Sequence, residues 1–242
     1  MMLNNSSFKI FIDFDGTIST TDVGEAMFLY FGEKEKSIKF VNDWIEQKIN
    51  SNQLSKLLCG TVHNFDEIKF DEFLNKIAID QTFRPFVRFC KSEGFEVKIL
   101  SDGFDFYIQK ILKRENLMDL DVYSNKLIID KNKNISPEFP YTDEECTRCA
   151  NCKRNHVLNF SSEEDFTIYI GDGLTDTCPA QHCDFIFAKD SLLKYCEINR
   201  ITFFPYSNFN DVLNKLTELK SKKRLNKRHQ AELKRKEVFK QG

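Results

Sequence analysis

FKIFIDFDGT, residues 8–17, is the stretch that decides the fold. Its short apolar run predicts a buried strand, and Gly16 predicts a tight turn directly after that strand. The strand leads into Asp13 and Asp15, two carboxylates separated by Phe14. Alternate side chains of an extended segment point to the same side, so we expect both carboxylates on one side of the chain. Two carboxylates so close repel each other unless a cation neutralises them or one stays protonated.

Beyond this strand, helical and strand patterns follow one another along the chain. Residues 22–80 repeat apolar side chains at helical spacing, which predicts an all-helical insert. Further strands are predicted at 95–100, 166–170, 184–188 and 201–204, β-like pieces within 120–141, and helices at 85–92, 104–114, 152–160 and from 208 to near the end. Such alternation implies an α/β fold with a doubly wound parallel sheet. We place the catalytic core at 1–20 and 82–242 and the helical insert at 21–81.

Acidic and hydroxyl residues follow the predicted strands. Ser101 and Asp102 come after the second strand, and Asp172 and Asp176 come after a later one. Ligands of open α/β sheets bind outside the carboxyl ends of the strands, so we expect these side chains to share a site with Asp13. Carboxylate and carbonyl oxygens are ligands that Mg²⁺ prefers. The pattern therefore predicts a magnesium site at this edge of the sheet.

Phosphoryl transfer is a chemistry that such a site could perform. It needs an in-line nucleophile, neutralisation of charge and an acid for the leaving group. A carboxylate can be the nucleophile and form an aspartyl-phosphate. Thr17, Ser101 and Lys153 could donate hydrogen bonds to phosphate oxygens, together with backbone N–H groups at the turns.

Four motifs resemble those of the haloacid dehalogenase superfamily, in the family's order. They are DFDGT at 13–17, Ser101 after a buried strand, Lys153, and GDGLTD at 171–176. The resemblance implies a Rossmann-like core with an inserted helical cap. It also implies a Mg²⁺-dependent phosphatase of the phosphoserine-phosphatase-like subclass, acting through an aspartyl-phosphate intermediate.

The resemblance assigns roles residue by residue. Asp13 matches the nucleophile and a metal ligand. Asp15 matches the general acid/base, and its backbone carbonyl matches a metal contact. Ser101 and Lys153 match the phosphate binders, Asp172 matches a direct metal ligand, and Asp176 matches a ligand or the partner of one. A second aspartate at position 15 can protonate the leaving oxygen and later activate water, which argues for a phosphatase or a phosphotransferase.

Two narrower resemblances bear on the substrate. CTRCANCKRNHVL at 146–158 and YIGDGLTDTCPA at 169–180 are similar to the phosphoethanolamine/phosphocholine phosphatases. Asp102 matches an aspartate that those enzymes place near the substrate ammonium. Gly24 stands where those enzymes carry a second aspartate, on the cap side, so half of the ammonium site is missing unless Asp22 takes its place. SDGFDFY at 101–107 is similar to the methionine-salvage phosphatase that acts on a hydroxy-keto-methylthiopentenyl phosphate. That group resembles this chain at Asp22 but not at Asp102. Both Asp22 and Asp102 are therefore candidate substrate contacts.

The eight cysteines are expected to be reduced thiols or metal ligands, because no export signal is apparent. Cys146, Cys149 and Cys152 form a C-x2-C-x2-C pattern just before Lys153. This spacing could bind zinc if His156, Cys178 or Cys183 supplied a fourth ligand. Reduced thiols that shape the loop, or a disulfide outside a reducing compartment, are the alternatives.

Charge and hydropathy bear on partners and location. The net charge is −2, but residues 219–242 carry +8 and the rest carries −10, which fits either an anionic partner or a solvated C-terminal helix. No apolar run approaches the roughly 20 residues of a membrane span, and the N-terminus lacks a signal-peptide pattern. We expect a cytoplasmic enzyme of small phosphate monoesters without membrane or nucleic-acid partners. The alternatives are phosphotransfer at the same site and a non-catalytic binding protein that uses the basic tail.

Overall fold

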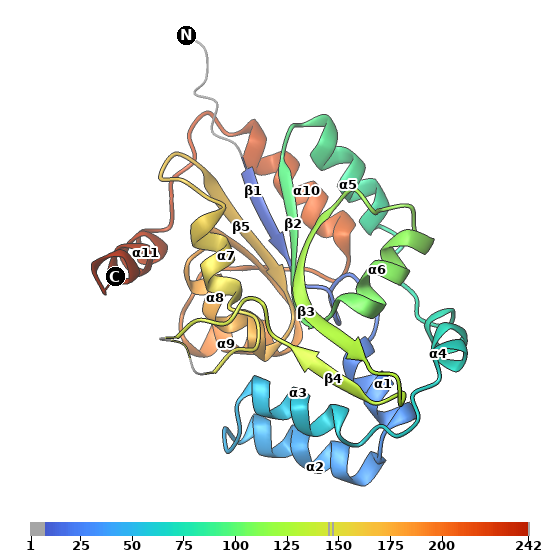
Figure 1. The fold of residues 1–242 in the computed structure, drawn as a ribbon. Coiled ribbons are helices and arrows are strands. Elements are labelled where there is room, and N and C mark those ends of the chain that lie inside the picture. The colour runs from blue at the N-terminus through green and yellow to red at the C-terminus, as the bar shows by residue number, and fades with distance from the viewer. Residues whose placement is uncertain (1–7, 145, 147, 242) are drawn as a thin grey trace. The chain divides into compact units, whose positions relative to one another are not determined.

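The computed structural model describes residues 8–144, 146 and 148–241 and has the predicted α/β fold (Figure 1). Its seven-stranded sheet has the order β4-β3-β2-β1-β5-β6-β7. β1 pairs in parallel with β2 and β5, and β5–β6 and β6–β7 are also parallel, whereas β3 and β4 form an antiparallel pair. The strands are β1 (Phe8–Ile12), β2 (Glu96–Phe104), β3 (Asp121–Ile129), β4 (Ile135–Glu138), β5 (Phe166–Gly171), β6 (Phe185–Ala188) and β7 (Phe204–Pro205).

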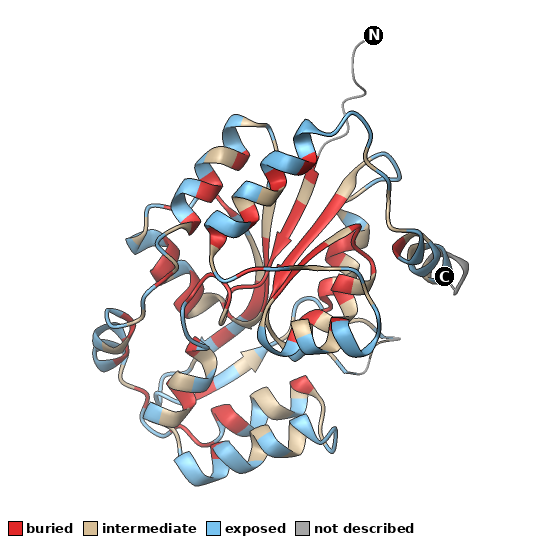
Figure 2. Cartoon of the chain, turned by 180° about the vertical axis from the view of Figure 1, so that it is seen from behind, coloured by how far each residue is buried: buried red, intermediate tan, exposed pale blue. Residues whose placement is uncertain are grey.

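β1 lies in the middle of the sheet, and its sequence explains that place. Ile10, Phe11 and Ile12 are consecutive, and all three are buried. A strand covered on both faces needs apolar residues without alternation, as is typical of parallel sheets. Ile10 faces Val97 of β2 on one side and Ile168 of β5 on the other. Buried residues therefore concentrate along the central strands (Figure 2).

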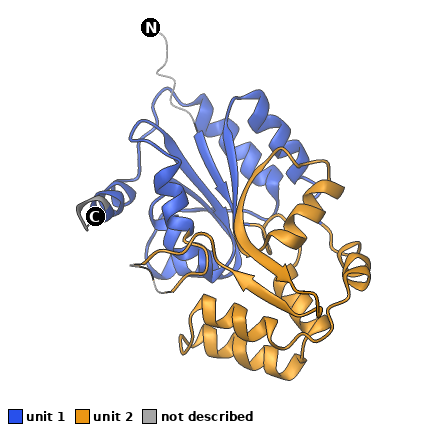
Figure 3. Cartoon of the chain, viewed as in Figure 1, with its two compact units in different colours: residues 1–13, 79–100, 153–242 blue, residues 14–78, 101–152 orange. Residues whose placement is uncertain are grey.

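The chain forms two compact units (Figure 3). Unit 1 holds the described residues of 1–13, 79–100 and 153–242. Its helices are α5 (Phe83–Ser92), α7 (Lys153–Asn159), η1 (Leu174–Asp176, a 3-10 turn), α8 (Thr177–Gln181), α9 (Asp190–Ile198), α10 (Phe209–Ser221) and α11 (His229–Gln241). The strand order extends in both directions from β1, as in doubly wound sheets. α5 packs on α10 through Phe83 and Phe86, whose ring centroids lie 4.8 and 5.0 Å from that of Phe209.

Unit 2 holds the described residues of 14–78 and 101–152. Its helices are α1 (Val23–Phe31), α2 (Lys34–Ile45), α3 (Ser51–Cys59), α4 (Glu67–Leu74) and α6 (Asp105–Arg114), and it includes β3, β4 and the end of β2. Phe70 of α4 packs against Phe106 of α6 with ring centroids 5.3 Å apart. Arg114 of α6 donates to the backbone carbonyls of Leu74 and Ile77. Residues 21–78 of the predicted helical insert thus belong to one unit with residues 101–152, while residues 79–81 belong to unit 1. The assignment of 21–81 as a separate cap stays a prediction.

Three elements differ from the sequence-based expectation. The β-like pieces within 120–141 form an antiparallel hairpin instead of continuing the parallel order. The last strand is two residues long, Phe204–Pro205, and begins at the end of the predicted range. The C-terminal helix is broken after Ser221 and resumes at His229.

Arg228 gives the physical reason for the break in the C-terminal helix. Its guanidinium donates to the backbone carbonyls of Ala180, Gln181 and Cys183 at 2.8, 2.8 and 2.9 Å. These carbonyls lie at the end of α8, where a helix leaves its last acceptors unpaired. Arg235 of α11 also pairs with Asp184 at 3.0 Å. Part of the basic tail therefore binds the body of unit 1. Among the described residues, no helix combines the length and apolar character of a membrane span.

Candidate active site

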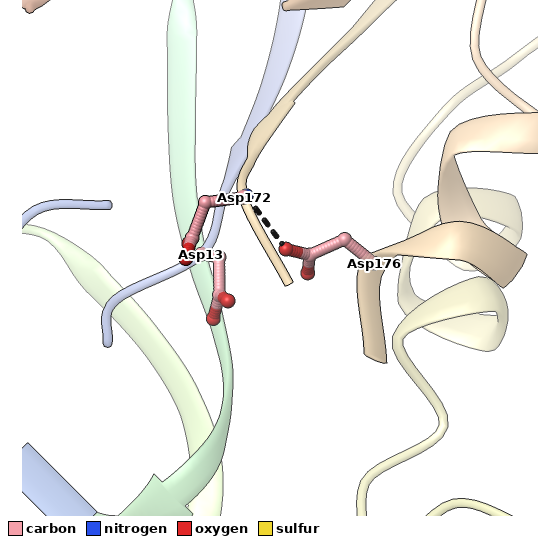
Figure 4. Close-up of side chains that lie close together, drawn as sticks. All are labelled: Asp13, Asp172 and Asp176. Carbon is pink, nitrogen blue, oxygen red and sulfur yellow. Dashed lines mark hydrogen bonds between the residues drawn. The ribbon is translucent and has the colours of Figure 1, made fainter. Parts of the chain in front are cut away.

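Three aspartates of unit 1 lie together at the carboxyl ends of β1 and β5. Asp13 directly follows β1, Asp172 directly follows β5, and Asp176 belongs to η1. Each offers one carboxylate oxygen, and these oxygens lie within 4.8 Å of one another (Figure 4). β1 and β5 are parallel neighbours, so their ends meet at the same edge of the sheet. This edge is where such folds bind ligands.

Lys153 is buried among these carboxylates. It begins α7, and its side chain is 2% exposed. Its Nζ lies 2.8 Å from Asp13 Oδ1, 2.7 Å from Asp176 Oδ1 and 3.2 Å from Thr175 Oγ1. A buried ammonium is tolerated only with such partners. Lys153 therefore joins the aspartate after β1 to the turn after β5.

Asp176 organises that turn. Its Oδ2 accepts the N–H groups of Asp172 and Gly173 at 3.0 and 2.9 Å, and its Oδ1 accepts Lys153 and, at 2.6 Å, the hydroxyl of Tyr169. A Cβ at Gly171 would meet Asp176 Oδ2 at 2.4 Å, so only glycine allows the carboxylate to approach. The GDG sequence is thus explained by the packing of Asp176 against the backbone.

The charges of this cluster are unbalanced. Burial raises the pKa of Asp13 well above its ordinary value, and the charge of Asp176 raises it further, while Lys153 opposes the rise. Burial also acts to raise the pKa of Asp176, but Lys153 and the hydrogen bonds outweigh it and lower that pKa. One buried lysine faces three carboxylates, so an added cation would relieve the repulsion. Asp13, Asp172 and Asp176 can therefore supply the oxygen ligands of a divalent metal ion.

A second group of polar residues belongs to unit 2 and surrounds Asp15. Its Oδ2 accepts the hydroxyl of Tyr107 at 2.7 Å and that of Ser101 at 3.2 Å. Its Oδ1 accepts the backbone N–H of Val23 at 2.9 Å, at the start of α1. Burial raises the pKa of Asp15 to about 7; the charge of Asp22 adds to the rise and the hydrogen bonds oppose it. A carboxyl with such a pKa can donate and accept a proton near neutral pH.

Gly103 lets Tyr107 and Ser101 reach Asp15. Its N–H donates to Ser101 Oγ at 2.9 Å, which orients that hydroxyl. A Cβ at Gly103 would lie 1.7 Å from the Tyr107 hydroxyl oxygen and 2.6 Å from Asp15 Oδ2. Burial and the neighbouring Asp15 also raise the pKa of Tyr107, so its hydroxyl stays a hydrogen-bond donor. The glycine is therefore required by the close approach of these groups.

The remaining predicted site residues also lie in unit 2. Asp22 is the N-cap of α1 and accepts the N–H of Glu25 at 2.7 Å. Asp102 accepts the N–H of Asn151 at 2.9 Å through its carboxylate. Thr17 is 2% exposed, and its N–H contacts the carbonyl of Phe14 at 3.3 Å. The roles of all three residues toward a substrate stay predictions.

The structure thus brings the predicted residues together in two groups. Asp13, Lys153, Asp172 and Asp176 form the group in unit 1, and Asp15, Thr17, Asp22, Ser101 and Asp102 belong to unit 2. The chain crosses between the units directly after Asp13, directly before Ser101 and directly before Lys153. Sequence reasoning gave no role to Tyr107 and Tyr169, because a tyrosine on a helix or strand gives no signal of the carboxylate that it will contact.

Comparisons with known proteins bear on the family and the fold of the chain. A family model described as "Putative Phosphatase" matches residues 8–200. The chain is 32% identical over 225 residues to the 2-hydroxy-3-keto-5-methylthiopentenyl-1-phosphate phosphatase of Bacillus mycoides (strain KBAB4), covering 88% of this chain and 97% of the relative. The phosphatase of the same name from Bacillus cytotoxicus is 31% identical over 221 residues, with the same coverage.

Solved structures resemble the fold. A phospho-aspartyl intermediate analogue of phosphoserine phosphatase matches with a TM-score of 0.66 at 18% identity, covering 87% of this chain and 98% of that chain. A substrate-bound phosphoserine phosphatase also gives 0.66 at 18% identity, with coverage of 88% and 99%. At this identity the likeness bears on the fold alone.

Proposed function

The chain belongs to the family described as "Putative Phosphatase", and from that premise we propose that it hydrolyses a small phosphorylated metabolite with Mg²⁺ through an aspartyl-phosphate on Asp13. The family is of the haloacid dehalogenase type, and this chain is a phosphoric monoester hydrolase. The observation that carries the proposal is the cluster of buried Asp13 and Asp176 and half-buried Asp172 with Lys153, at the carboxyl ends of adjacent parallel strands.

The first chemical step uses Asp13 as the nucleophile. A carboxylate oxygen of Asp13 attacks phosphorus, the bond from phosphorus to the leaving oxygen breaks, and an acyl phosphate forms. Lys153, held 2.8 Å from Asp13 Oδ1, lies where its charge would attract the phosphoryl oxygens. When bound by Asp13, Asp172 and Asp176, with the backbone carbonyl of Asp15 as a further ligand, Mg²⁺ would offset the charge of the carboxylates and of the phosphoryl group.

Asp15 is proposed as the general acid and base. It gives its proton to the leaving oxygen and later takes one from the water that attacks phosphorus, which releases inorganic phosphate and restores Asp13. The donors from Tyr107, Ser101 and Val23 fix the Asp15 carboxyl, and its pKa of about 7 suits both steps. Thr17 and Ser101 are proposed to donate to phosphate oxygens, as the family resemblance implies.

The substrate named for the relatives is the first candidate for this chain. We propose a neutral leaving group, as in 2-hydroxy-3-keto-5-methylthiopentenyl-1-phosphate, ahead of the cationic leaving group of phosphocholine. The carboxylate of Asp102 already accepts a hydrogen bond from Asn151, which supports this ranking, because an ammonium site needs a carboxylate directed at the ligand. Asp22 at the start of α1 is the remaining candidate contact from the insert.

Residues 21–81 are proposed to act as the cap. Val23 at the start of α1 donates to Asp15, so a movement of this helix would change the hydrogen bonding of the acid/base. Hydrogen exchange with Mg²⁺ and orthovanadate should slow in α1 relative to the free protein. Unchanged exchange throughout 21–81 would contradict the proposed role of these residues as a cap.

The test of the proposed function is phosphate release from a panel of monoesters with Mg²⁺ or with a chelator. The panel holds p-nitrophenyl phosphate, the relatives' substrate, phosphocholine, phosphoethanolamine and phosphoserine. We expect hydrolysis that requires Mg²⁺, the highest kcat/KM for the relatives' substrate, and background rates for Asp13→Asn. Asp43→Asn is the matched control, because Asp43 of α2 pairs with the exposed Lys48 and belongs to neither group of site residues. Full activity of Asp13→Asn would refute the mechanism, and a higher kcat/KM for phosphocholine would refute the proposed substrate.

A further inference from the structure

Two arginines of the basic tail, Arg228 and Arg235, bind the body of unit 1 and have no part in the proposed chemistry. Arg228 directly precedes α11, and its carbonyl accepts the N–H groups of Ala231 and Glu232 at 2.9 and 3.2 Å, so this helix begins at Arg228. Arg235 follows after about two helical turns. The two guanidinium groups can therefore act on neighbouring parts of unit 1.

The turn between α8 and β6 is held by both arginines. Four consecutive backbone carbonyls accept hydrogen bonds from the two guanidinium groups at 2.8 to 2.9 Å; they belong to Ala180, Gln181, His182 and Cys183. A helix leaves its last carbonyls without partners inside the helix, and arginine side chains can satisfy them. Arg228 and Arg235 thus supply the donors that the end of α8 lacks.

Asp184 ties the same turn to β5. Its carboxylate is buried, and its Oδ1 pairs with Arg235 at 3.0 Å. Its Oδ2 accepts the N–H and the hydroxyl of Thr167 in β5 at 3.0 and 2.9 Å. Arg235 also donates to Thr167 Oγ1 at 3.1 Å. Arg235 therefore joins the turn after α8 to the strand that leads into Asp172.

The short helix α8 connects this turn to the aspartate cluster. It has five residues and begins directly after Asp176. Such a helix is only about 7 Å long, so a displacement of one end is passed to the other. Gln181 Nε2 donates to the carbonyl of Thr177 at 3.2 Å and to the hydroxyl of Tyr195 at 2.9 Å, which ties the last residue of α8 to the first. The position of Asp176 therefore depends on how the far end of α8 is held.

Asp176 has little freedom to shift. Its carboxylate accepts hydrogen bonds of 2.6 to 3.0 Å from Tyr169, Lys153 and the N–H groups of Asp172 and Gly173. Hydrogen bonds weaken steeply when they are stretched or misaligned. Residues that hold metal ligands in place commonly matter to metal affinity nearly as much as the ligands themselves. A loosened α8 should therefore weaken metal binding without the loss of any ligand.

We propose that Arg228 and Arg235 are positioning residues of the metal site, which keep Asp176 in place through α8. This inference rests on the proposed function, in which Asp13, Asp172 and Asp176 bind Mg²⁺. It gives the basic tail a role within the enzyme itself. Removal of either guanidinium would leave carbonyls at the end of α8 without their donors, and the turn would relax toward other partners.

Mg²⁺ binding to the metal-free full-length chain tests the proposal by isothermal titration calorimetry. Arg228→Ala should weaken the affinity roughly tenfold, and Arg235→Ala should act in the same direction. Arg228→Lys should recover only part of the affinity, because a single ammonium cannot reach several carbonyls as a planar guanidinium does. The matched control is Arg224→Ala, a change at an exposed arginine of the same tail, which should bind Mg²⁺ as the wild type does.

Chemical rescue separates positioning from general destabilisation. Millimolar methylguanidinium should restore part of the Mg²⁺ affinity of Arg228→Ala and leave that of Arg224→Ala unchanged. Circular dichroism identifies a variant that fails to fold, and the milder Arg228→Lys then carries the comparison.

Amide exchange of the metal-free protein gives a readout that does not depend on Mg²⁺. The N–H groups of Asp172 and Gly173 report on Asp176, because its Oδ2 accepts both. By nuclear magnetic resonance, Arg228→Ala should speed the exchange of these two amides more than that of β1, whereas general destabilisation would speed both alike. Unchanged Mg²⁺ affinity in both Arg228→Ala and Arg235→Ala would overturn the proposal. Weakened Mg²⁺ binding in these variants, combined with a wild type that hydrolyses no phosphate monoester, would refute the proposed function and leave this inference in place.

Discussion

Replacing the proposed nucleophile should stabilise the metal-free protein while it abolishes activity. Asp13 is 5% exposed and shares its surroundings with the carboxylates of Asp172 and Asp176 and the ammonium of Lys153. Asp13→Asn keeps the size of the side chain and removes one negative charge from this excess. Natural active sites often retain such unfavourable charges because the reaction needs them.

The size of the effect follows from the distances. At an effective dielectric constant of about 20, each carboxylate within 4.8 Å of Asp13 repels it by about 3 kcal/mol or more, and Lys153 at 2.8 Å attracts it by about 6 kcal/mol. These terms nearly cancel, which leaves the cost of burying the charge itself. We therefore expect Asp13→Asn to raise the free energy of unfolding by about 1 to 3 kcal/mol without metal, or roughly 2–4 °C in Tm for each kcal/mol.

Thermal unfolding with and without Mg²⁺ measures this effect. Mg²⁺ should raise the Tm of the wild type and raise that of Asp13→Asn much less, so the difference between them shrinks. The matched control is Asp184→Asn, a buried aspartate whose charge is balanced by Arg235 at 3.0 Å and which should lose stability. A metal-free Asp13→Asn protein less stable than the wild type would refute the charge argument.

Three further predictions concern Tyr107 in unit 2 and Gly171 and His182 in unit 1. Tyr107→Phe removes a 2.7 Å hydrogen bond to Asp15 and should lower kcat about tenfold with little change in KM. Gly171→Ala places a Cβ 2.4 Å from Asp176 Oδ2 and should cost about 1–3 kcal/mol of stability and weaken Mg²⁺ binding. Burial lowers the pKa of His182 to about 4, below its ordinary 6.5, so the unfolded chain binds a proton first as the pH falls. His182 alone should take about 2 kcal/mol from the free energy of unfolding between pH 7 and 5, and His182→Gln should remove that contribution, as measured by urea unfolding.

The two site predictions have control variants, and each of the three has a result that would contradict it. Tyr123→Phe is the control for Tyr107→Phe, and equal losses of kcat in both would mean that the Asp15 contact does not matter. Gly60→Ala is the control for Gly171→Ala, because its added Cβ would meet nothing closer than 3.4 Å. Equal stability of the two alanine variants would refute the packing argument. An unchanged pH slope in His182→Gln would show that other groups cause the acid sensitivity.

The fold could be predicted because the decisive signals are local. One apolar strand leads into Asp13, and a second ends at Gly171. Strands that alternate with helices form a parallel sheet, whose carboxyl ends lie at the same edge, so Asp13 and Asp172 were expected to lie close together. The break after Ser221 could not be predicted from periodicity. It depends on Arg228, which contacts carbonyls of α8 at positions 45 to 48 residues earlier in the chain.

The candidate site could be predicted by residue type but not by contact. Lys153 and Ser101 were expected to bind phosphate, and the structure pairs Lys153 with Asp13 and Asp176 and Ser101 with Asp15. A sequence motif does not specify which acceptor a flexible donor contacts. For the same reason the contact of the Tyr107 hydroxyl with Asp15 could not be predicted, because it depends on the placement of α6 relative to the segment after β1.

The proposed mechanism requires Asp13 to carry the phosphoryl group. Intact-protein mass spectrometry after acid quench during turnover of p-nitrophenyl phosphate with Mg²⁺ tests it most directly. We expect a fraction of the protein to gain the mass of one phosphoryl group and fragmentation to place it on the peptide with Asp13, while Asp13→Asn should show neither the adduct nor turnover. A phosphoryl group found on another residue, or turnover by Asp13→Asn at the wild-type rate, would contradict it.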